Sequence, residues 1–295
     1  MLSSGPFAVL ANRRRLLQRG AVMSAAAAAV AGLVSPARAQ ESGQSLLNRV
    51  LDRGTVIVGT GSTNPPWHFE DENGALVGMD IEMGRILALA LFEDTEKVEF
   101  LTQAADARIP NLLSDKTDIV IQFMSETRDR AQLVNFTIPY YREAVTLLFP
   151  ADSAYTSVND AQDKGLTVSV LQNVYAEDLV HRGVPDAVVS QFDSNANTIL
   201  ALDSGRVEAA LADFSTAQWF SAQSPDQYKY ASDTWGTHSY VAAVKTGDQV
   251  WLNFVNSVFH VAMTGLDFDM YRSAFEKYFG QAIELPPPGY PTELS

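Results

Sequence analysis

The chain of 295 residues contains no cysteine and only four histidines. The lack of cysteine excludes disulfide bonds, a thiolate nucleophile and a lipid attached through sulfur. The histidines are scattered along the chain and show no spacing typical of metal ligands. The sequence also lacks a Gly–x–Ser–x–Gly nucleophile motif and a glycine-rich phosphate loop. We therefore expect no metal, no cofactor and no catalytic residues.

Basic residues are scarce, with 21 Lys and Arg against 35 Asp and Glu. Five of the arginines lie in residues 1–39, which contain no acid, so a chain without that segment carries a net charge of −19. Nucleic acids and anionic membrane surfaces are recognised by basic patches. The charge therefore argues against both classes of partner.

Residues 1–39 have the features of an export signal. Arg13, Arg14 and Arg15 precede an uncharged run over residues 21–34, and small residues follow at Ala37 and Ala39. The uncharged run, about 14 residues long, is too short to span a membrane. Residues 12–18 are typical of a twin-arginine signal, and an ordinary secretory leader is the alternative. The sequence predicts cleavage before residue 40 and a mature protein without a lipid anchor.

Two segments 90 residues apart repeat one pattern. Ile, Leu and Ser recur at equivalent positions of residues 109–123 and 199–213, and each segment then enters an apolar run. The pattern predicts a helix, a turn and a buried strand in both places, and hence two similar α/β lobes. Ligands of open α/β sheets bind beyond the carboxyl ends of strands. This rule directs the search for a site to Gln122 and Phe123, and to Ala212 and Asp213.

Strand and helix signals extend this plan over the whole chain. Apolar runs predict strands over residues 55–60, 98–101, 144–149, 166–171 and 240–244. Helical spacing predicts a helix with Asp80 as its N-cap, and helices over residues 250–263 and 270–278. Polar stretches suit crossovers near residues 150 and 236. We expect lobe 1 to comprise residues 40–149 and 236–295, lobe 2 residues 150–235, and a two-strand hinge beside a cleft.

Several motifs, in this order, carry a family resemblance. They are the Gly–Thr strand end, Pro–aromatic step and Gly–x–Asp of residues 54–83, Arg108–Ile109–Pro110, Thr127 to Arg130, Pro139–Tyr140–Tyr141, Ser204–Gly205–Arg206 leading to Asp213, and Tyr278–Phe279–Gly280. The chain resembles the periplasmic amino-acid-binding proteins of ABC importers, the bacterial extracellular solute-binding proteins of family 3. The resemblance covers about residues 40 to 285. It implies the type II periplasmic binding protein fold, with two α/β lobes and a two-strand hinge.

The resemblance also implies roles for individual residues. An amino acid presents a carboxylate and an ammonium group, which require a cation and an anion on the protein. By resemblance, Arg130 binds the α-carboxylate, with Arg128 as its rival, and Asp213 binds the α-ammonium group. Ser125 and the backbone around Phe123 are expected on the carboxylate side.

Other implied contacts depart from the family pattern. Relatives have a Gly–Ser/Thr–Thr loop where this chain has Asn173, Val174 and Tyr175, and Val174 brings no hydroxyl group. Trp67 occupies the aromatic step, either as a wall of the cleft or as a core residue.

Three further positions bear on which amino acid is bound. Asn64 replaces an aromatic lid of many relatives. Gly61 replaces the aspartate of relatives that bind basic amino acids, which argues against such ligands. Arg108 could serve an acidic side chain, although relatives of several specificities share it.

The sequence thus predicts a binding protein that is not an enzyme. Ligand-induced closure would deliver an amino acid, or a close derivative, to a permease in the inner membrane. We expect a monomer in the periplasm. The alternatives are a periplasmic cyclohexadienyl dehydratase acting on prephenate or arogenate, with Glu126, Glu177 or His68 as proton donor, and a soluble sensor for a membrane receptor.

Overall fold

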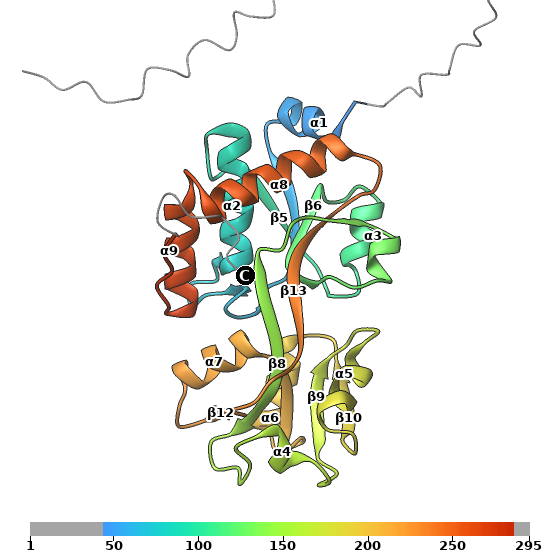
Figure 1. Ribbon diagram of the computed structural model, residues 1–295, viewed down its shortest axis with the longest axis vertical. Helices are drawn as coiled ribbons and strands as arrows, with labels where there is room; N and C mark the ends of the chain where they lie inside the picture. Colours follow the sequence, from blue (N-terminus) through green and yellow to red (C-terminus); the bar gives the residue numbers. More distant parts are fainter. Residues whose placement is uncertain (1–43, 286–295) are drawn as a thin grey trace, which may run out of the picture. The chain divides into compact units, whose positions relative to one another are not determined.

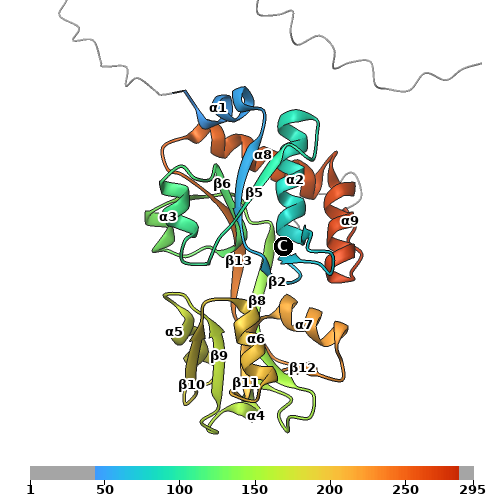
Figure 2. The ribbon, with the colours of Figure 1, turned by 180° about the vertical axis from the view of Figure 1, so that it is seen from behind.

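The computed structural model describes residues 44–285, which belong to one compact unit. The predicted export signal, residues 1–39, lies outside the described residues. Eight strands of a ten-stranded main sheet follow the order β10-β9-β11-β8-β13-β6-β1-β5, while β12 pairs with β8 and β7 pairs with β13. A small second sheet has the order β2-β3-β4. The arrangement is seen from two opposite sides in Figures 1 and 2.

The strands of the main sheet are β1 Val56–Thr60, β5 Val98–Thr102, β6 Ile119–Ser125, β7 Asn135–Phe136, β8 Tyr141–Pro150, β9 Thr167–Leu171, β10 Val188–Phe192, β11 Ala209–Asp213, β12 Tyr228–Tyr230 and β13 Trp235–Val244. The small sheet comprises β2 Thr63–Asn64, β3 His68–Glu70 and β4 Leu76–Val77. The helices are α1 Leu46–Arg53, α2 Met79–Phe92, α3 Arg108–Leu113, the 3-10 turn η2 Arg130–Gln132, α4 Val158–Ala161, α5 Ala176–Gly183, α6 Asn195–Asp203, α7 Phe214–Gln223, α8 Gln249–Thr264 and α9 Phe268–Phe279.

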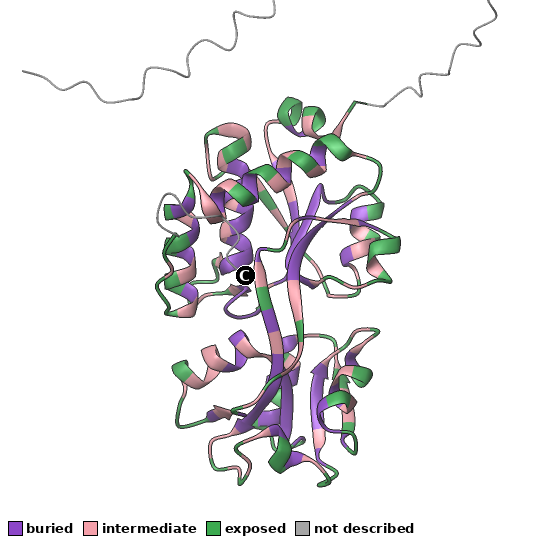
Figure 3. Ribbon diagram, viewed as in Figure 1, coloured by how far each residue is buried: buried purple, intermediate pink, exposed green. Residues whose placement is uncertain are grey.

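Each end of the main sheet is covered by helices on both faces. In β6, Ile119 and Ile121 pack in one cluster with side chains of α2, α8 and α9, while Val120 packs on the opposite face with Leu112 of α3. Successive side chains of a strand point to opposite faces, so a strand covered on both sides needs an unbroken apolar run. The run in β11 is divided in the same way between α5 on one face and α6 with α7 on the other. The buried strands are visible in Figure 3.

Two long antiparallel strands, β8 and β13, connect the two halves of the sheet (Figure 1). They pair with each other from Tyr141↔Tyr240 to Val145↔Trp235. Beyond this shared stretch β8 pairs with β11, and β13 pairs with β6. Each strand therefore contributes to both halves, as expected for a two-strand hinge. The predicted lobe boundaries fall at the end of β8 and the start of β13.

The doubled segment forms the same local structure twice. Helix α3 leads through a turn to β6, and α6 leads through a turn to β11. Equivalent turn residues, Asp115 and Gly205, have φ values of 57° and 67°. The residue after each turn closes it with an equivalent bond, Lys116 N to Asn111 O at 3.0 Å and Arg206 N to Ala201 O at 3.0 Å. The helix–turn–strand prediction from the repeated sequence is confirmed.

The prediction that Asp80 caps helix α2 is wrong. The N-cap is Gly78, with φ 127°, and Asp80 lies in the first turn, fully buried. A side chain at position 78 would collide with the backbone of Trp67, so this N-cap position requires glycine. The carboxylate of Asp80 has a different use, at the candidate site.

Candidate functional site

A cavity of about 540 Å³ lies beside the β8–β13 hinge. It is bordered by the ends of β6 and β11, by the segment 125–130 that follows β6, by the loop after β9 and by residues 236–240 of β13. The carboxyl-terminal ends of β6 and β11 are thus at the same cavity, which is where the repeat predicted a site. Arg130, Asp213, Ser125, Phe123, Asn173 and Tyr175 all line it.

The guanidinium of Arg130 is the cationic group predicted for this cavity. Its Nη1 donates a hydrogen bond of 2.9 Å to the carbonyl oxygen of Ser125. The group lies 5.9 Å from the centre of the Tyr175 ring, a distance at which a cation–π contact forms. Burial lowers the pKa of Arg130. The remaining N–H groups of this fork suit a carboxylate in the cavity.

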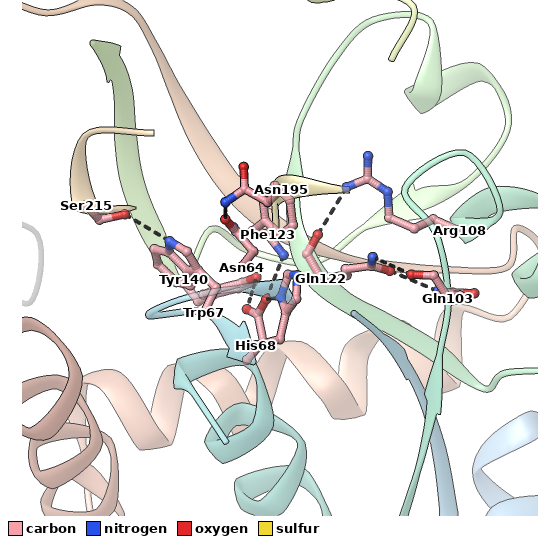
Figure 4. Close-up of polar contacts among 11 residues, drawn as sticks. Asn64, Trp67, His68, Gln103, Arg108, Gln122, Phe123, Tyr140, Asn195 and Ser215 are labelled. Atoms are coloured by element: carbon pink, nitrogen blue, oxygen red, sulfur yellow. Dashed lines mark hydrogen bonds and ion pairs between the residues drawn. The ribbon is translucent and has the colours of Figure 1, made fainter. Parts of the chain in front are cut away.

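A second arginine, Arg108, lines the same cavity and is only 5 % exposed. It donates from Nε to Ala105 O at 2.7 Å. It also donates from Nη1 to Gln122 O at 3.1 Å (Figure 4). Its guanidinium lies 5.6 Å from the centre of the Phe123 ring. Burial, followed by the positive charge of Arg130, lowers the pKa of Arg108 to about 9. The sequence drew attention to Arg108 but gave no sign of this burial.

Two acids lie close to each other at the hinge, Asp213 at the end of β11 and Glu143 on the hinge strand β8. Asp213 ends β11, and burial raises the pKa of its carboxyl group, although the charges of His238 and Arg108 oppose the rise. Glu143 on β8 is 3 % exposed, and burial followed by the charge of Asp213 raises its pKa to about 8. Glu143 accepts a hydrogen bond from the Ser215 hydroxyl. Sequence reasoning missed Glu143, because nothing local marks it as buried.

Asp80 fixes the backbone at the end of β6. Its Oδ2 accepts from Phe123 N and contacts His68 Nδ1, each at 2.8 Å, and its Oδ1 accepts from Tyr140 OH at 2.8 Å. Phe123 has φ 33°, and its ring stacks on His68 at 4.7 Å. The Gly–x–Asp motif therefore shapes the strand end that carries the site.

Three residues predicted to bind ligand do not line this cavity. Trp67 is fully buried and donates from Nε1 to Ser215 Oγ at 2.9 Å (Figure 4), so of the two readings left open the structure supports a core residue. Gln122 faces a second cavity of about 350 Å³, where its amide pairs with Gln103 at 3.1 Å. Val174 is 87 % exposed and lies outside both linings.

The two cavities adjoin, because they share Asn64, Phe123, Leu171 and Asn195. The side chains of Asn64 and Asn195 hydrogen-bond to each other between them (Figure 4). Asn64 Nδ2 is buried and has no hydrogen-bond partner within residues 44–285. The acid that lines the second cavity, Asp193, is exposed.

A further contact joins the loop after β9 to the segment after β6. The hydroxyl of Tyr175 donates to Asp129 Oδ2 at 2.6 Å. Asn173 Oδ1 in turn accepts from Tyr175 N at 2.9 Å and fixes the loop. This contact connects the two halves across the cavity. Within residues 44–285, no group of three or more His, Asp or Glu residues could hold a metal ion. No helix in this part of the chain is long and apolar enough to cross a membrane.

Comparison with known proteins identifies the family. The model of the bacterial extracellular solute-binding proteins, family 3, matches residues 56–281. The chain belongs to this family, which confirms the predicted class, a solute-binding protein rather than an enzyme.

Individual relatives agree in length and fold. A glutamine-binding protein of Geobacillus stearothermophilus is 28% identical over 206 residues, 68% of this chain and 76% of the relative. The L-cystine-binding protein of Escherichia coli is 27% identical over 270 residues, 90% of this chain and 97% of the relative. The crystal structure of a cysteine-binding protein from Campylobacter jejuni matches with 27% identity and a TM-score of 0.72, covering 80% of this chain and 93% of that one. The chain has the mixed α/β fold of these binding proteins, as predicted.

Proposed function

We propose that this protein is the amino-acid-binding component of an ABC importer. The observation that carries the proposal is that one cavity is lined by both Arg130, which follows the first copy of the repeated unit, and Asp213, which ends the second. A half-buried cation and a half-buried anion in the lining of one cavity match the carboxylate and ammonium groups of an amino acid. Relatives described as binding glutamine, L-cystine and cysteine support the same ligand class.

In this proposal the ligand stabilises the closed form of the protein. Arg130, with Ser125 and the amides near Phe123, binds the α-carboxylate, and Asp213 binds the α-ammonium group. The contact of Tyr175 with Asp129 is made across the cavity and would be lost on opening. A ligand that touches both halves shifts the equilibrium by its differential affinity for the closed form. The closed monomer then presents its surface to a permease.

The proposal extends to the location of the protein. The family is described as extracellular. We propose that the protein is exported by the twin-arginine route and released by cleavage before residue 40. It then resides in the periplasm without a lipid anchor. We also propose that residues 150–235 form lobe 2 and that residues 40–149 and 236–295 form lobe 1.

A thermal-shift screen of the twenty common amino acids tests the proposal. At a hundred times the dissociation constant a ligand stabilises the folded state by about 2.7 kcal/mol. For a protein of this size that corresponds to a rise in Tm of roughly 5 to 11 °C. No rise with any amino acid at millimolar concentration would overturn the proposal. A rise with prephenate, accompanied by release of phenylpyruvate, would instead establish the dehydratase alternative.

A further inference from the structure

The cavity has two arginines in its lining, and the buried acid whose charge acts on Arg108, Asp80, has both carboxylate oxygens bonded to other groups. Arg108 and Arg130 both line it, and neither forms an ion pair with an acidic side chain within residues 44–285. Arg108 donates two of its N–H groups to the carbonyl oxygens of Ala105 and Gln122, while its Nη2 has no acceptor within residues 44–285. A buried charge is costly unless an opposite charge compensates it.

Asp213 does not balance both arginines. Asp213 is the acid of the cavity lining whose pKa is raised by burial. The proposed function assigns it to the ligand ammonium group. Of the other acids that line the cavity, Asp178 pairs with Arg182, Asp129 accepts from Tyr175, and Glu126 is exposed. The like charge of Arg130 adds to burial in lowering the pKa of Arg108. An anion between the two guanidinium groups would offset both the burial of Arg108 and its repulsion by Arg130.

We infer that the ligand is an amino acid with a second carboxylate, and that Arg108 is the residue that binds this group. The inference rests on the proposed function, because it presumes that Arg130 and Asp213 bind the amino-acid group.

The spacing of the two cations defines the ligand further. Arg108 is anchored on Gln122 O and Arg130 on Ser125 O, three residues apart on β6. An extended chain separates such positions by at most about 10 Å. A single dicarboxylic amino acid, such as glutamate or a longer homologue, can therefore contact both cations with its two carboxylates. The absence of an acid at Gly61, and the exposure of Asp193, leave no buried anion for a cationic side chain in the described lining of the second cavity.

The first experiment compares L-glutamate with L-glutamine on the wild-type protein by isothermal titration calorimetry. The two ligands have nearly the same size and differ in the charge of the terminal group. We expect glutamate, or its homologue 2-aminoadipate against the matching amide, to bind at least tenfold more tightly. Equal or tighter binding of the amides overturns the inference while leaving the proposed function intact. Failure of every amino acid to bind overturns the proposed function.

The second experiment assigns the effect to Arg108. We expect Arg108→Met to reduce the preference for glutamate over glutamine to less than twofold, and to change the affinity for glutamine less than threefold. Arg128→Met is the matched control, since it removes an exposed arginine of the same cavity, and it should keep the preference. Arg108→Lys keeps the charge but loses the fork, and should show an intermediate preference.

A merely structural role for Arg108 gives a different result. If its bonds to Ala105 and Gln122 only hold the backbone, Arg108→Met weakens both ligands by the same factor and the preference survives, which contradicts the assignment. Melting temperatures of the variants report whether they fold. If Arg108→Met does not fold, the comparison of Arg108→Lys with the wild-type ligand pair decides.

Discussion

Replacing Glu143 with glutamine should flatten the dependence of stability on pH between about pH 5 and 8. The carboxyl group is buried beside Asp213, and its pKa rises from the ordinary 4.5 to about 8 because of burial and of the charge of Asp213. Glutamine keeps the shape of the protonated acid and can still accept from the Ser215 hydroxyl. It cannot acquire a charge.

The sign and size follow from the two pKa values. Between pH 4.5 and 8 the folded protein retains a proton on Glu143 that the unfolded chain has released. The free energy of unfolding therefore falls as pH rises, by up to about 1.4 kcal/mol per pH unit. Over the whole interval the loss is at most about 5 kcal/mol, and less where Asp213 takes up the proton instead. The stabilising contribution of the protonated Glu143 is fully present below its ordinary pKa of 4.5 and is lost as pH rises through its raised pKa of about 8.

Urea denaturation at pH 5, 6, 7 and 8 measures the effect. The difference in unfolding free energy between Glu143→Gln and wild type should grow with pH in favour of the variant, because groups common to both proteins cancel. Glu126→Gln, at an exposed acid of the cavity lining, should run parallel to wild type. Parallel curves for Glu143→Gln and wild type would refute the assignment of a buried, protonated Glu143.

Three other substitutions test separate parts of the account. Asp213→Asn should weaken an amino acid at least a hundredfold in calorimetry but its deaminated analogue less than fivefold, and equal losses would show that Asp213 does not meet the ammonium group. Tyr175→Phe removes the 2.6 Å bond to Asp129, worth about 1 kcal/mol, and should speed ligand dissociation about fivefold in stopped-flow fluorescence, whereas an unchanged rate counts against a contact that holds the closed form. Trp67→Phe should lower stability to urea by about 1–2 kcal/mol through the lost bond to Ser215, with ligand affinity changed less than threefold, and a large loss of affinity would return Trp67 to the binding site.

The sequence predicted the parts of the fold that local patterns determine. The repeated unit could be recognised because a helix, a turn and a buried strand each have a periodic signature over a few residues. The turn residues Asp115 and Gly205 adopt the same left-handed conformation, so even the different residue types follow one plan. The ends of β6 and β11 were predicted as the site for the same reason, and they line one cavity.

The parts that failed depend on contacts between distant residues. Asp80 has the right type and position for an N-cap, but its carboxylate instead holds Phe123 N and Tyr140 OH. The sequence left Trp67 open between core and cleft, and its burial follows from Ser215, 148 positions further along the chain. No local signal announces such partners.

Arg108 and Glu143 show the same limit for charged residues. Both occur in stretches where a charged side chain would ordinarily face solvent, and both are at most 5 % exposed. Their burial comes from the packing of β6 and of the hinge strand β8, which a single sequence does not specify. Arg108, in the cavity lining, adds a second cation to Arg130 and Asp213.

The most direct test of the central claim is the effect of Arg130→Ala on amino-acid binding, measured by isothermal titration calorimetry with the tightest ligand from the thermal-shift screen. Loss of the cationic partner of the carboxylate should cost about 3–5 kcal/mol, a decrease in affinity of roughly 150-fold to several thousandfold. Arg128→Ala, at the exposed neighbour, should retain most of the affinity. An unchanged dissociation constant for Arg130→Ala, or a collapse confined to Arg128→Ala, would contradict the account.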